Sequence, residues 1–413
     1  MWEPILNGAL RNKAIAAVDA VAVVLPKKRG KIEPSLAGGA AGIALFYAYL
    51  ARARVGYNEI ALRFLKLAAN GVSRMPMSRS LYGGFTGIAW PAAHLRARLL
   101  DPADDSTAPV DQLLQRELSE KPWRGQYDLV SGLVGFGVYA LERMPKPGAI
   151  QCLRQIIDRL DETAERKSDG ITWFTSRDML IRSQRKAHPH GYYNLGLAHG
   201  VPGVIALLAK VCSLKPGRAT MLPKTQVKAG CLLEGAVAWL LAQKLSHDSS
   251  STFPYCTGPG VEQIPSRVAW CYGDLGIATA LLAAALSMNN PAWKGEALQL
   301  GRKVCRRHLR ESGVVDSGLC HGAAGVGHLF NRLFQRTGEP LFKQAARKWF
   351  RRTLDTRHSE QSVAGFFACR PDRTGKLRCV PSIGLVDGAA GVALALLAAS
   401  TDVEPNWDRI MML

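Results

Sequence analysis

A glycine-rich repeat that occurs seven times constrains the fold of this 413-residue chain more than any other feature. Each copy has a first glycine, two further residues and a second glycine, and an apolar stretch rich in small residues follows. Internal repeats at this spacing are typical of repeat architectures, in which each copy contributes one structural unit. The first glycines of the seven copies are Gly39, Gly84, Gly132, Gly200, Gly273, Gly322 and Gly388.

The stretches after the glycine pairs are apolar on all sides, which predicts helices that are buried all round. Examples are 43–50, 204–210, 277–285 and 392–399. Amphipathic stretches such as 59–69, 293–309 and 341–354 lie between the copies and are expected to pack outside them. We therefore predict an all-α fold, an α/α toroid of seven inner and seven outer helices. An open solenoid is the alternative, but polar capping repeats are not evident.

We expect residues 1–413 to form a single toroid domain with an insertion on one face. The segment 145–194 fits the repeat poorly, and it combines a helical stretch near 150–165 with a short β-like stretch at 170–176. We interpret this segment as the insertion. The longest apolar stretch, 388–399, is shorter than the roughly 20 residues that a membrane-spanning helix needs.

The cysteine content and the net charge limit which cell compartment and which partners are expected for this chain. Nine scattered cysteines in a large chain argue against a disulfide framework and for a reducing cytoplasm. We interpret Cys369 and Cys379 as free structural thiols, with a disulfide or a metal site as the alternatives. The net charge of +20 comes without a nucleic-acid-binding signature, so no nucleic acid is expected. It indicates either solvated surfaces or attraction to an acidic partner or an anionic surface.

Reactive side chains occupy nearby positions in four repeats. Cys271 and Cys320 each lie two residues before the first glycine, His199 and His321 one residue before it, and Asp128 four residues before it. Corresponding positions in a closed ring face one central end, so we expect these side chains to converge. Cys271, Cys320 and His321 then form a set of three zinc ligands with an open fourth position, which is the catalytic arrangement. Taken singly, each cysteine is also consistent with an inert core residue, and His321 with a loop histidine.

Three motifs together give a family resemblance. They are Tyr193-Asn194-Leu195-Gly196-Leu197-Ala198-His199-Gly200, Trp270-Cys271-Tyr272-Gly273 and Cys320-His321-Gly322. With the seven glycine repeats in order, the whole chain resembles the LanC family of lanthionine cyclases. Its length, without a dehydratase region, is expected of a stand-alone cyclase rather than a fused synthetase.

The resemblance implies one catalytic zinc ion on Cys271, Cys320 and His321. It further implies that a peptide cysteine adds to dehydroalanine or dehydrobutyrine, which gives lanthionine or methyllanthionine rings. The implied partners are a dehydrated precursor peptide with its leader, a dehydratase and a membrane exporter complex. The implied location is therefore cytoplasmic, with peripheral membrane association through such a complex as a further option.

The resemblance also implies catalytic roles for four residues. His199 matches the acid/base histidine of the family and Asp128 its active-site acid. Arg267 and Tyr272 match the arginine and tyrosine that flank the first zinc cysteine. Leu275 departs from the family pattern, in which proline is common at this position. Independently of the family, a histidine suits proton donation to the α-carbon, and an arginine or a tyrosine suits stabilisation of an enolate oxygen.

Structural roles remain open for the same residues. His199 or Asp128 is equally consistent with a cap of the following helix, Arg267 with an ion pair, and Tyr272 with the core. Asp387, at the histidine position of the seventh repeat, is expected to be a helix cap.

Three rival functions are also open. They are a LanC-like transferase that uses glutathione as the thiol, a zinc-thiolate prenyltransferase on another α/α toroid, and a non-catalytic scaffold.

Overall fold

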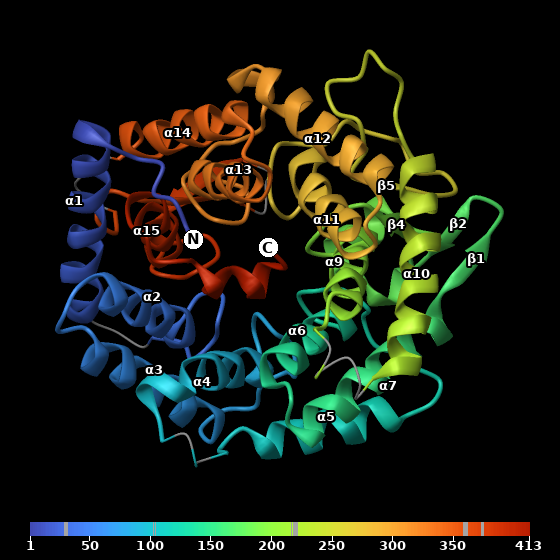
Figure 1. Ribbon diagram of the computed structural model, residues 1–413, viewed down its shortest axis with the longest axis horizontal. Coiled ribbons are helices and arrows are strands. Elements are labelled where there is room, and N and C mark those ends of the chain that lie inside the picture. The colour runs from blue at the N-terminus through green and yellow to red at the C-terminus, as the bar shows by residue number, and fades with distance from the viewer. Residues whose placement is uncertain are drawn as a thin grey trace. The chain divides into compact units, whose positions relative to one another are not determined.

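The computed structural model (Figure 1) describes residues 1–28, 32–101, 103, 105–215, 217, 222–357, 362–372 and 376–413. Its contacts divide the chain into two compact units. Unit 1 comprises Met1–Ser78, Tyr82–Asp104 and Ser312–Asp408. Unit 2 comprises Arg79–Leu81, Asp105–Glu311 and Arg409–Leu413.

Unit 1 has two layers of helices, as Figure 1 shows for α13 beneath α14. The inner helices are α2 (Ala40–Ala53), α4 (Phe85–Leu99), α13 (Ala323–Thr337) and α15 (Ala389–Ser400). The outer helices are α1 (Gly8–Val24), α3 (Asn58–Val72) and α14 (Pro340–Asp355). Helix α2 packs against α3, α13 against α14, and α15 against α1, while α15 also contacts α2 and α13.

Unit 2 has the same layering. Its inner helices are α6 (Leu133–Arg143), α9 (Val201–Cys212) and α11 (Asp274–Ser287). Its outer helices are α5 (Ala108–Ser119), α7 (Pro147–Thr163), α10 (Pro223–Ala242) and α12 (Pro291–Arg306). Helix α6 packs against α7, α9 against α10, and α11 against α12. The six-residue helix α8 (Arg182–Ala187) and the 3₁₀ turn η2 (Arg177–Met179) stand apart from this pattern.

The burial of the two layers follows the predicted hydrophobic pattern. Every residue of α15 is buried, and so are the first twelve residues of α11, Asp274–Ala285. In contrast, α14 is buried along one face only, at Phe342, Ala346, Trp349 and neighbouring positions. The expected combination of helices that are apolar all round with amphipathic outer helices is therefore present in both units.

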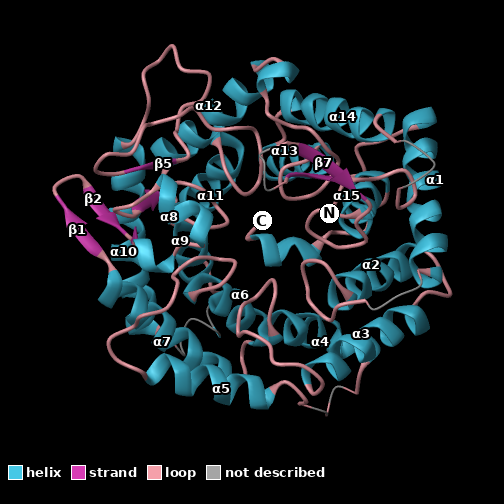
Figure 2. Ribbon diagram, turned by 180° about the vertical axis from the view of Figure 1, so that it is seen from behind, coloured by secondary structure: helices cyan, strands magenta, loops and turns pink. Residues whose placement is uncertain are grey.

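Short strands supplement the helices (Figure 2). Strand β1 (Glu165–Lys167) pairs with β2 (Gly170–Thr172), and β6 (Ala368–Pro371) pairs with β7 (Leu377–Val380). A three-stranded antiparallel sheet has the order β3 (Phe174–Thr175), β4 (Tyr192–Asn194) and β5 (Cys256–Thr257). This sheet places β4 next to the loop that precedes α9, where the Asn194-to-Gly200 motif lies.

Close backbone approach explains the glycines of the repeat. A Cβ atom on Gly39, Gly200 or Gly273 would lie 1.9–2.0 Å from the carbonyl oxygen of the residue six positions earlier. The second glycines have the same relation: a Cβ on Gly325 or Gly391 would lie 1.9 or 1.8 Å from such an oxygen. The loop therefore folds back over the helix start so tightly that only glycine fits. Among the first glycines of the seven repeats, Gly273 alone has a positive φ, +110°.

Backbone hydrogen bonds connect the loops of successive repeats within each unit. In unit 1, the amide of Cys320 donates to Val386 (3.0 Å), Val386 donates to Ala37 (3.0 Å), and Ala37 donates to Tyr82 (2.9 Å). In unit 2, Leu129 donates to Ala198 (3.2 Å), and Ala198 donates to Cys271 (3.3 Å). The residues expected to carry the chemistry thus lie on loops that are held together by the main chain.

The interpretation of Cys369 and Cys379 as free thiols is wrong. These residues face each other across the β6–β7 pair, with Cα atoms 3.9 Å apart, and form a disulfide. The sequence did not reveal the pairing because it depends on the strand register. The other seven cysteines are not in disulfides. Within the described residues, no helix combines the length and the apolar character that a membrane crossing requires.

We predict that Gly391→Ala destabilises the protein strongly. The added Cβ would collide with the carbonyl oxygen of Leu385 at 1.8 Å, so the loop or α15 must shift. Strain of this kind costs about 2–4 kcal/mol, to be measured as a lowered urea midpoint of unfolding.

Gly295→Ala is the matched control for this prediction. Gly295 is exposed in α12, and its added Cβ would have no neighbour within 4 Å. Alanine should stabilise this helix position by about 0.5–1 kcal/mol. Equal midpoints for the two variants would refute the close-approach explanation.

Candidate functional site

A hydrogen-bonded histidine–carboxylate pair forms the centre of the site in unit 2. Nδ1 of His199 donates to Oδ2 of Asp128 at 2.6 Å, and the other carboxylate oxygen, Oδ1, accepts the amide of Ser131 at 2.8 Å. Asp128 is buried, whereas the His199 side chain is 42% exposed. The Asp128 carboxylate is therefore fixed on its own loop and determines which ring nitrogen of His199 faces outward.

The environment favours the charged form of His199. Burial opposes the imidazolium, but the hydrogen bond and the negative charge of Asp128 outweigh it, so the pKa of His199 is raised above its ordinary value. A larger fraction of His199 is then protonated near neutral pH. This suits a group that donates a proton.

Tyr272 lies beside His199 and is held by Asn194. The ring centroids of His199 and Tyr272 are 6.2 Å apart. Nδ2 of Asn194 donates to the Tyr272 hydroxyl at 3.0 Å, while Oδ1 of Asn194 accepts the amide of Gly196 at 2.8 Å. Burial raises the pKa of Tyr272 well above its ordinary value. Its hydroxyl therefore stays protonated and can donate a hydrogen bond.

Arg267 is positioned by a second tyrosine. Both its backbone amide and its Nε donate to the hydroxyl of Tyr255, at 3.1 and 3.2 Å. The ring of Tyr255 is in turn 5.5 Å from that of Tyr272, centroid to centroid. The four residues for which the family resemblance implied catalytic roles thus lie on neighbouring loops of unit 2 with a shared set of supporting contacts.

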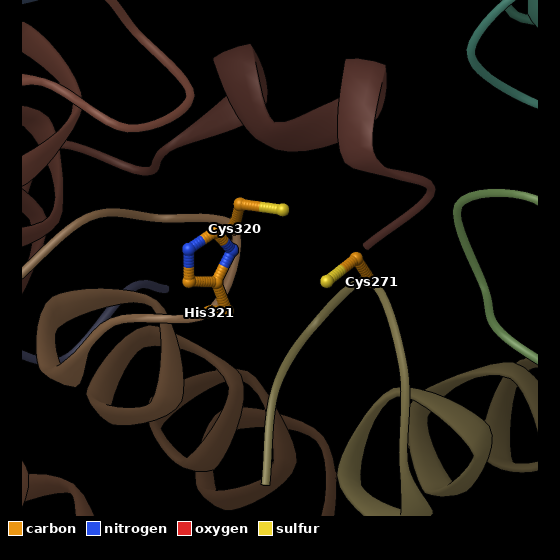
Figure 3. Close-up of side chains that lie close together, drawn as sticks. All are labelled: Cys271, Cys320 and His321. Atoms are coloured by element: carbon orange, nitrogen blue, oxygen red, sulfur yellow. The ribbon is translucent and has the colours of Figure 1, made fainter. Parts of the chain in front are cut away.

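The three predicted metal ligands also come together (Figure 3). One ligand atom from each of Cys271, Cys320 and His321 lies within 4.8 Å of the other two, and no other group in the described part of the chain could hold a metal ion in this way. Figure 3 shows both sulfur atoms and the imidazole turned toward the same space. Two thiolates and an imidazole are a donor set that zinc prefers, so these residues fit this metal.

Asp316 provides a carboxylate close to one of these ligands. Its Oδ2 is 3.9 Å from Nε2 of His321 and accepts the amide of Cys369 at 2.9 Å. The side chain of Asp316 is only 2% exposed. Carboxylates near a metal-binding histidine orient its ring and raise its basicity, which is a suitable role for Asp316.

Sequence reasoning assigned no role to Asn194, Tyr255 or Asp316. A signal for two of them was present, because the position six residues before each first glycine is polar in every repeat. These residues are Glu33, Ser78, Gln126, Asn194, Arg267, Asp316 and Ser382. The carbonyl of Asn194 lies against the first glycine of its repeat, and in the sixth repeat the carboxylate oxygen Oδ1 of Asp316 lies against Gly322, so both side chains are held at the end of the loop. Tyr255 lies outside the repeat, and its role depends on β5 and the tertiary fold.

The expected helix caps are not found. The N-cap residue of α6 is Gly132 and that of α15 is Gly388, and neither helix has a side-chain cap. The helix amides are satisfied by loop carbonyls instead, as when Leu133 donates to Gln126 at 3.2 Å. Asp387 pairs with Arg370, so its expected capping role is wrong.

Comparison with known proteins gives one family over nearly the whole chain. The family model described as "Lanthionine synthetase C-like protein" matches residues 30–412. The nisin biosynthesis protein NisC of Lactococcus lactis subsp. lactis is 23% identical over 298 residues, 67% of each chain. Glutathione S-transferase LANCL1 of Danio rerio is 26% identical over 254 residues, which cover 58% of this chain and 55% of that relative.

A solved structure extends the comparison to the fold. The structure of nisin cyclase superposes on this chain with a TM-score of 0.74 at 19% sequence identity. The match covers 97% of this chain and 98% of the nisin cyclase chain. The predicted fold class, all-α and of the α/α toroid type, is confirmed by this match.

We predict that Asp128→Asn lowers the pKa of His199. The raised pKa depends mainly on the Asp128 carboxylate, and without its charge only the charge of Cys271 opposes the lowering effect of burial. The imidazole signals of His199 should then titrate at lower pH when followed by NMR.

Asp158→Asn serves as the control, because Asp158 is exposed and pairs with Lys228. An unchanged His199 titration in Asp128→Asn would show that the pair is structural. A raised pKa in the folded state stabilises the protein at low pH, and this stabilisation is lost as the pH rises through that pKa. Asp128→Asn should therefore also remove this part of the pH dependence.

Proposed function

Because the chain belongs to the lanthionine synthetase C-like family, we propose that it is a zinc-dependent peptide cyclase that forms thioether rings in a dehydrated precursor peptide. The observation that carries the proposal is the meeting of Cys271, Cys320 and His321, with ligand atoms within 4.8 Å of one another. Three protein ligands leave a fourth position for a substrate group, as in catalytic zinc sites.

The proposed reaction is the addition of a cysteine thiol to dehydroalanine or dehydrobutyrine. The sulfur bonds to the β-carbon, the double-bond electrons move toward the carbonyl, and a proton is delivered to the α-carbon, so no atom is lost. Bound Zn²⁺ would lower the pKa of the peptide thiol, which is ordinarily about 8.5, and so supply the nucleophile.

His199 is proposed as the proton donor to the α-carbon. Its raised pKa keeps a protonated fraction near neutral pH, and Asp128 holds the ring through Nδ1, which leaves Nε2 for the substrate. A positioned general acid contributes about 10²–10⁴-fold to a rate. Asp128 acts through His199 and is a positioning residue.

Tyr272 and Arg267 are proposed to stabilise the negative charge that develops on the carbonyl oxygen of the substrate. Tyr272 remains protonated because burial raises its pKa, and Asn194 fixes its hydroxyl. Arg267 carries a permanent positive charge and is oriented by Tyr255. Donors that are fixed before the reaction stabilise such charge without reorganisation.

A second candidate uses the same site with a different thiol. The similarity to the relative named Glutathione S-transferase LANCL1 supports a reaction in which glutathione adds to a dehydroamino acid. Competition between an internal cysteine and added glutathione on one dehydrated peptide discriminates the two functions, since the cyclase should close the ring and leave glutathione unused.

The proposed partners follow from the proposed reaction. A dehydratase must first convert serine or threonine in the precursor peptide, and an exporter complex is a further proposed partner. We place the reaction in the cytoplasm, with peripheral membrane association through such a complex.

We predict about one zinc ion per native chain and strongly reduced zinc in Cys271→Ala, Cys320→Ala and His321→Ala, measured by elemental analysis of purified protein. Each substitution removes one of three ligands, which should weaken zinc binding by orders of magnitude. Cys231→Ala, which changes an exposed cysteine outside disulfides, should keep its zinc. Zinc that is insensitive to all four substitutions would exclude the proposed site.

We predict that His199→Asn slows ring closure about 10²–10⁴-fold and leaves the zinc content unchanged. The assay follows the loss of a free thiol in a synthetic peptide with one cysteine and one dehydroalanine, detected by thiol alkylation and mass spectrometry. His247→Asn is the control, because no metal or catalytic role is assigned to His247. Equal rates for His199→Asn and the native protein would reject His199 as the proton donor.

A further inference from the structure

A basic pocket lies in the segment that follows β3 in unit 2. It has a volume of about 830 Å³ and is lined by eight residues of the stretch 177–186. Four of them are cationic, namely Arg177, Arg182, Arg185 and Lys186, and Asp178 is the one carboxylate in the lining. All four cations are exposed. The pocket therefore presents a concentrated positive charge to solvent.

Three of these cations are available to a ligand. In the described part of the chain, the side chains of Arg177, Arg182 and Lys186 have no hydrogen-bond or ion-pair partner. Arg185 is different, since its guanidinium donates to the carbonyl oxygens of Leu180 (2.8 Å) and Asp178 (3.1 Å). Arg185 thus holds α8 against η2 and keeps the other cations in place.

Apolar side chains accompany the charge. Ile181 is 66% exposed, and Met179 beside it is half-buried. Leu180 is buried and anchors this stretch. A surface that mixes unpaired cations with an exposed aliphatic side chain fits a peptide with acidic and apolar residues. The lining contains no aromatic ring on which a nucleic-acid base could stack, which disfavours a nucleic acid.

The basic pocket is attached to the loop that carries Asp128. Nε2 of Gln126 donates to the carbonyl oxygen of Met179 at 2.8 Å, and Asp128 follows Gln126 by two residues. On the other side, the hydroxyl groups of Tyr127 and Thr175 are 3.4 Å apart, and β3 pairs with β4, which contains Asn194. A ligand in the basic pocket is therefore bound next to the loop that carries Asp128.

We propose that the basic pocket binds an acidic stretch of the peptide substrate while the cysteine and the dehydroamino acid react at the His199 site. This proposal rests on the proposed cyclase function. Binding energy from a remote part of the substrate positions the reacting part, which is how such a pocket would contribute to ring closure. It also gives a specific role to part of the large positive charge of the chain.

The direct test uses two fluorescein-labelled synthetic peptides of twelve residues, one alternating Glu and Leu, and one with Gln in place of every Glu. Fluorescence anisotropy should show that the Glu peptide binds at least tenfold more tightly at low salt, with the difference reduced at 0.5 M salt. The double variant Arg182→Glu/Lys186→Glu should weaken binding of the Glu peptide at least tenfold.

The matched control is Lys294→Glu/Lys348→Glu, which makes the same change in net charge at exposed positions of α12 and α14. It should bind the Glu peptide within twofold of the native protein. Equal binding of the two peptides, or equal losses in both double variants, would overturn the proposal. Stronger competition by duplex DNA than by the Glu peptide would also overturn it and indicate a nucleic-acid surface.

A separate measurement distinguishes this proposal from the cyclase function. Ring closure in a short peptide without acidic residues should proceed in Arg182→Glu/Lys186→Glu within twofold of the native rate, because the reacting groups are untouched. A tenfold loss there would show that the variant damages the site and would count against a separate docking role. Absence of ring closure in the native protein would contradict the cyclase function, while the anisotropy measurement still decides acidic-peptide binding.

Discussion

The close approach of the repeat loops to the starts of their inner helices is the constraint on which the rest of this structure depends. Carbonyl oxygens six residues earlier occupy the space where a Cβ would be, as at Gly200 and Gly391. The folded-back loops then reach one another through backbone hydrogen bonds, such as that from Ala198 to Cys271. Side chains just before the first glycine are thereby presented from a rigid main chain, which is the condition for a precise site.

The chemistry of the site depends on which side chains the hydrogen-bonded repeat loops bury. Asp128 is buried and raises the pKa of the half-buried His199. Burial raises the pKa of Tyr272, which therefore stays protonated. A histidine whose raised pKa favours the protonated form thus lies next to a tyrosine that stays protonated and can donate a hydrogen bond. Two cysteines and a histidine supply the soft ligand set for zinc, and Asp316 supports one of them. The basic pocket adds a place for substrate away from the reacting atoms.

Much of the fold and of the candidate site could be predicted because both follow the repeat. The helices recur after each glycine pair, and Cys271, Cys320, His321, His199 and Asp128 occupy corresponding positions before it. Features outside the repeat could not be predicted. The Cys369–Cys379 disulfide depends on the register of β6 and β7, and the role of Tyr255 depends on how the chain folds back over the twelve positions that separate it from Arg267. Asp387 resembled a cap, but backbone carbonyls satisfy the helix amides and leave it free to pair with Arg370.

The sequence by itself determined the helical layers, the glycine positions and the residue types available for metal binding and proton transfer, because periodicity and local sterics act over short stretches of chain. Only the tertiary structure decided which polar groups meet. The hydrogen bond between His199 and Asp128 joins residues 71 positions apart, and that between Asn194 and Tyr272 joins residues 78 positions apart. Such pairings depend on the packing of whole helices and on burial, which set the pKa values, and neither is encoded in a local pattern.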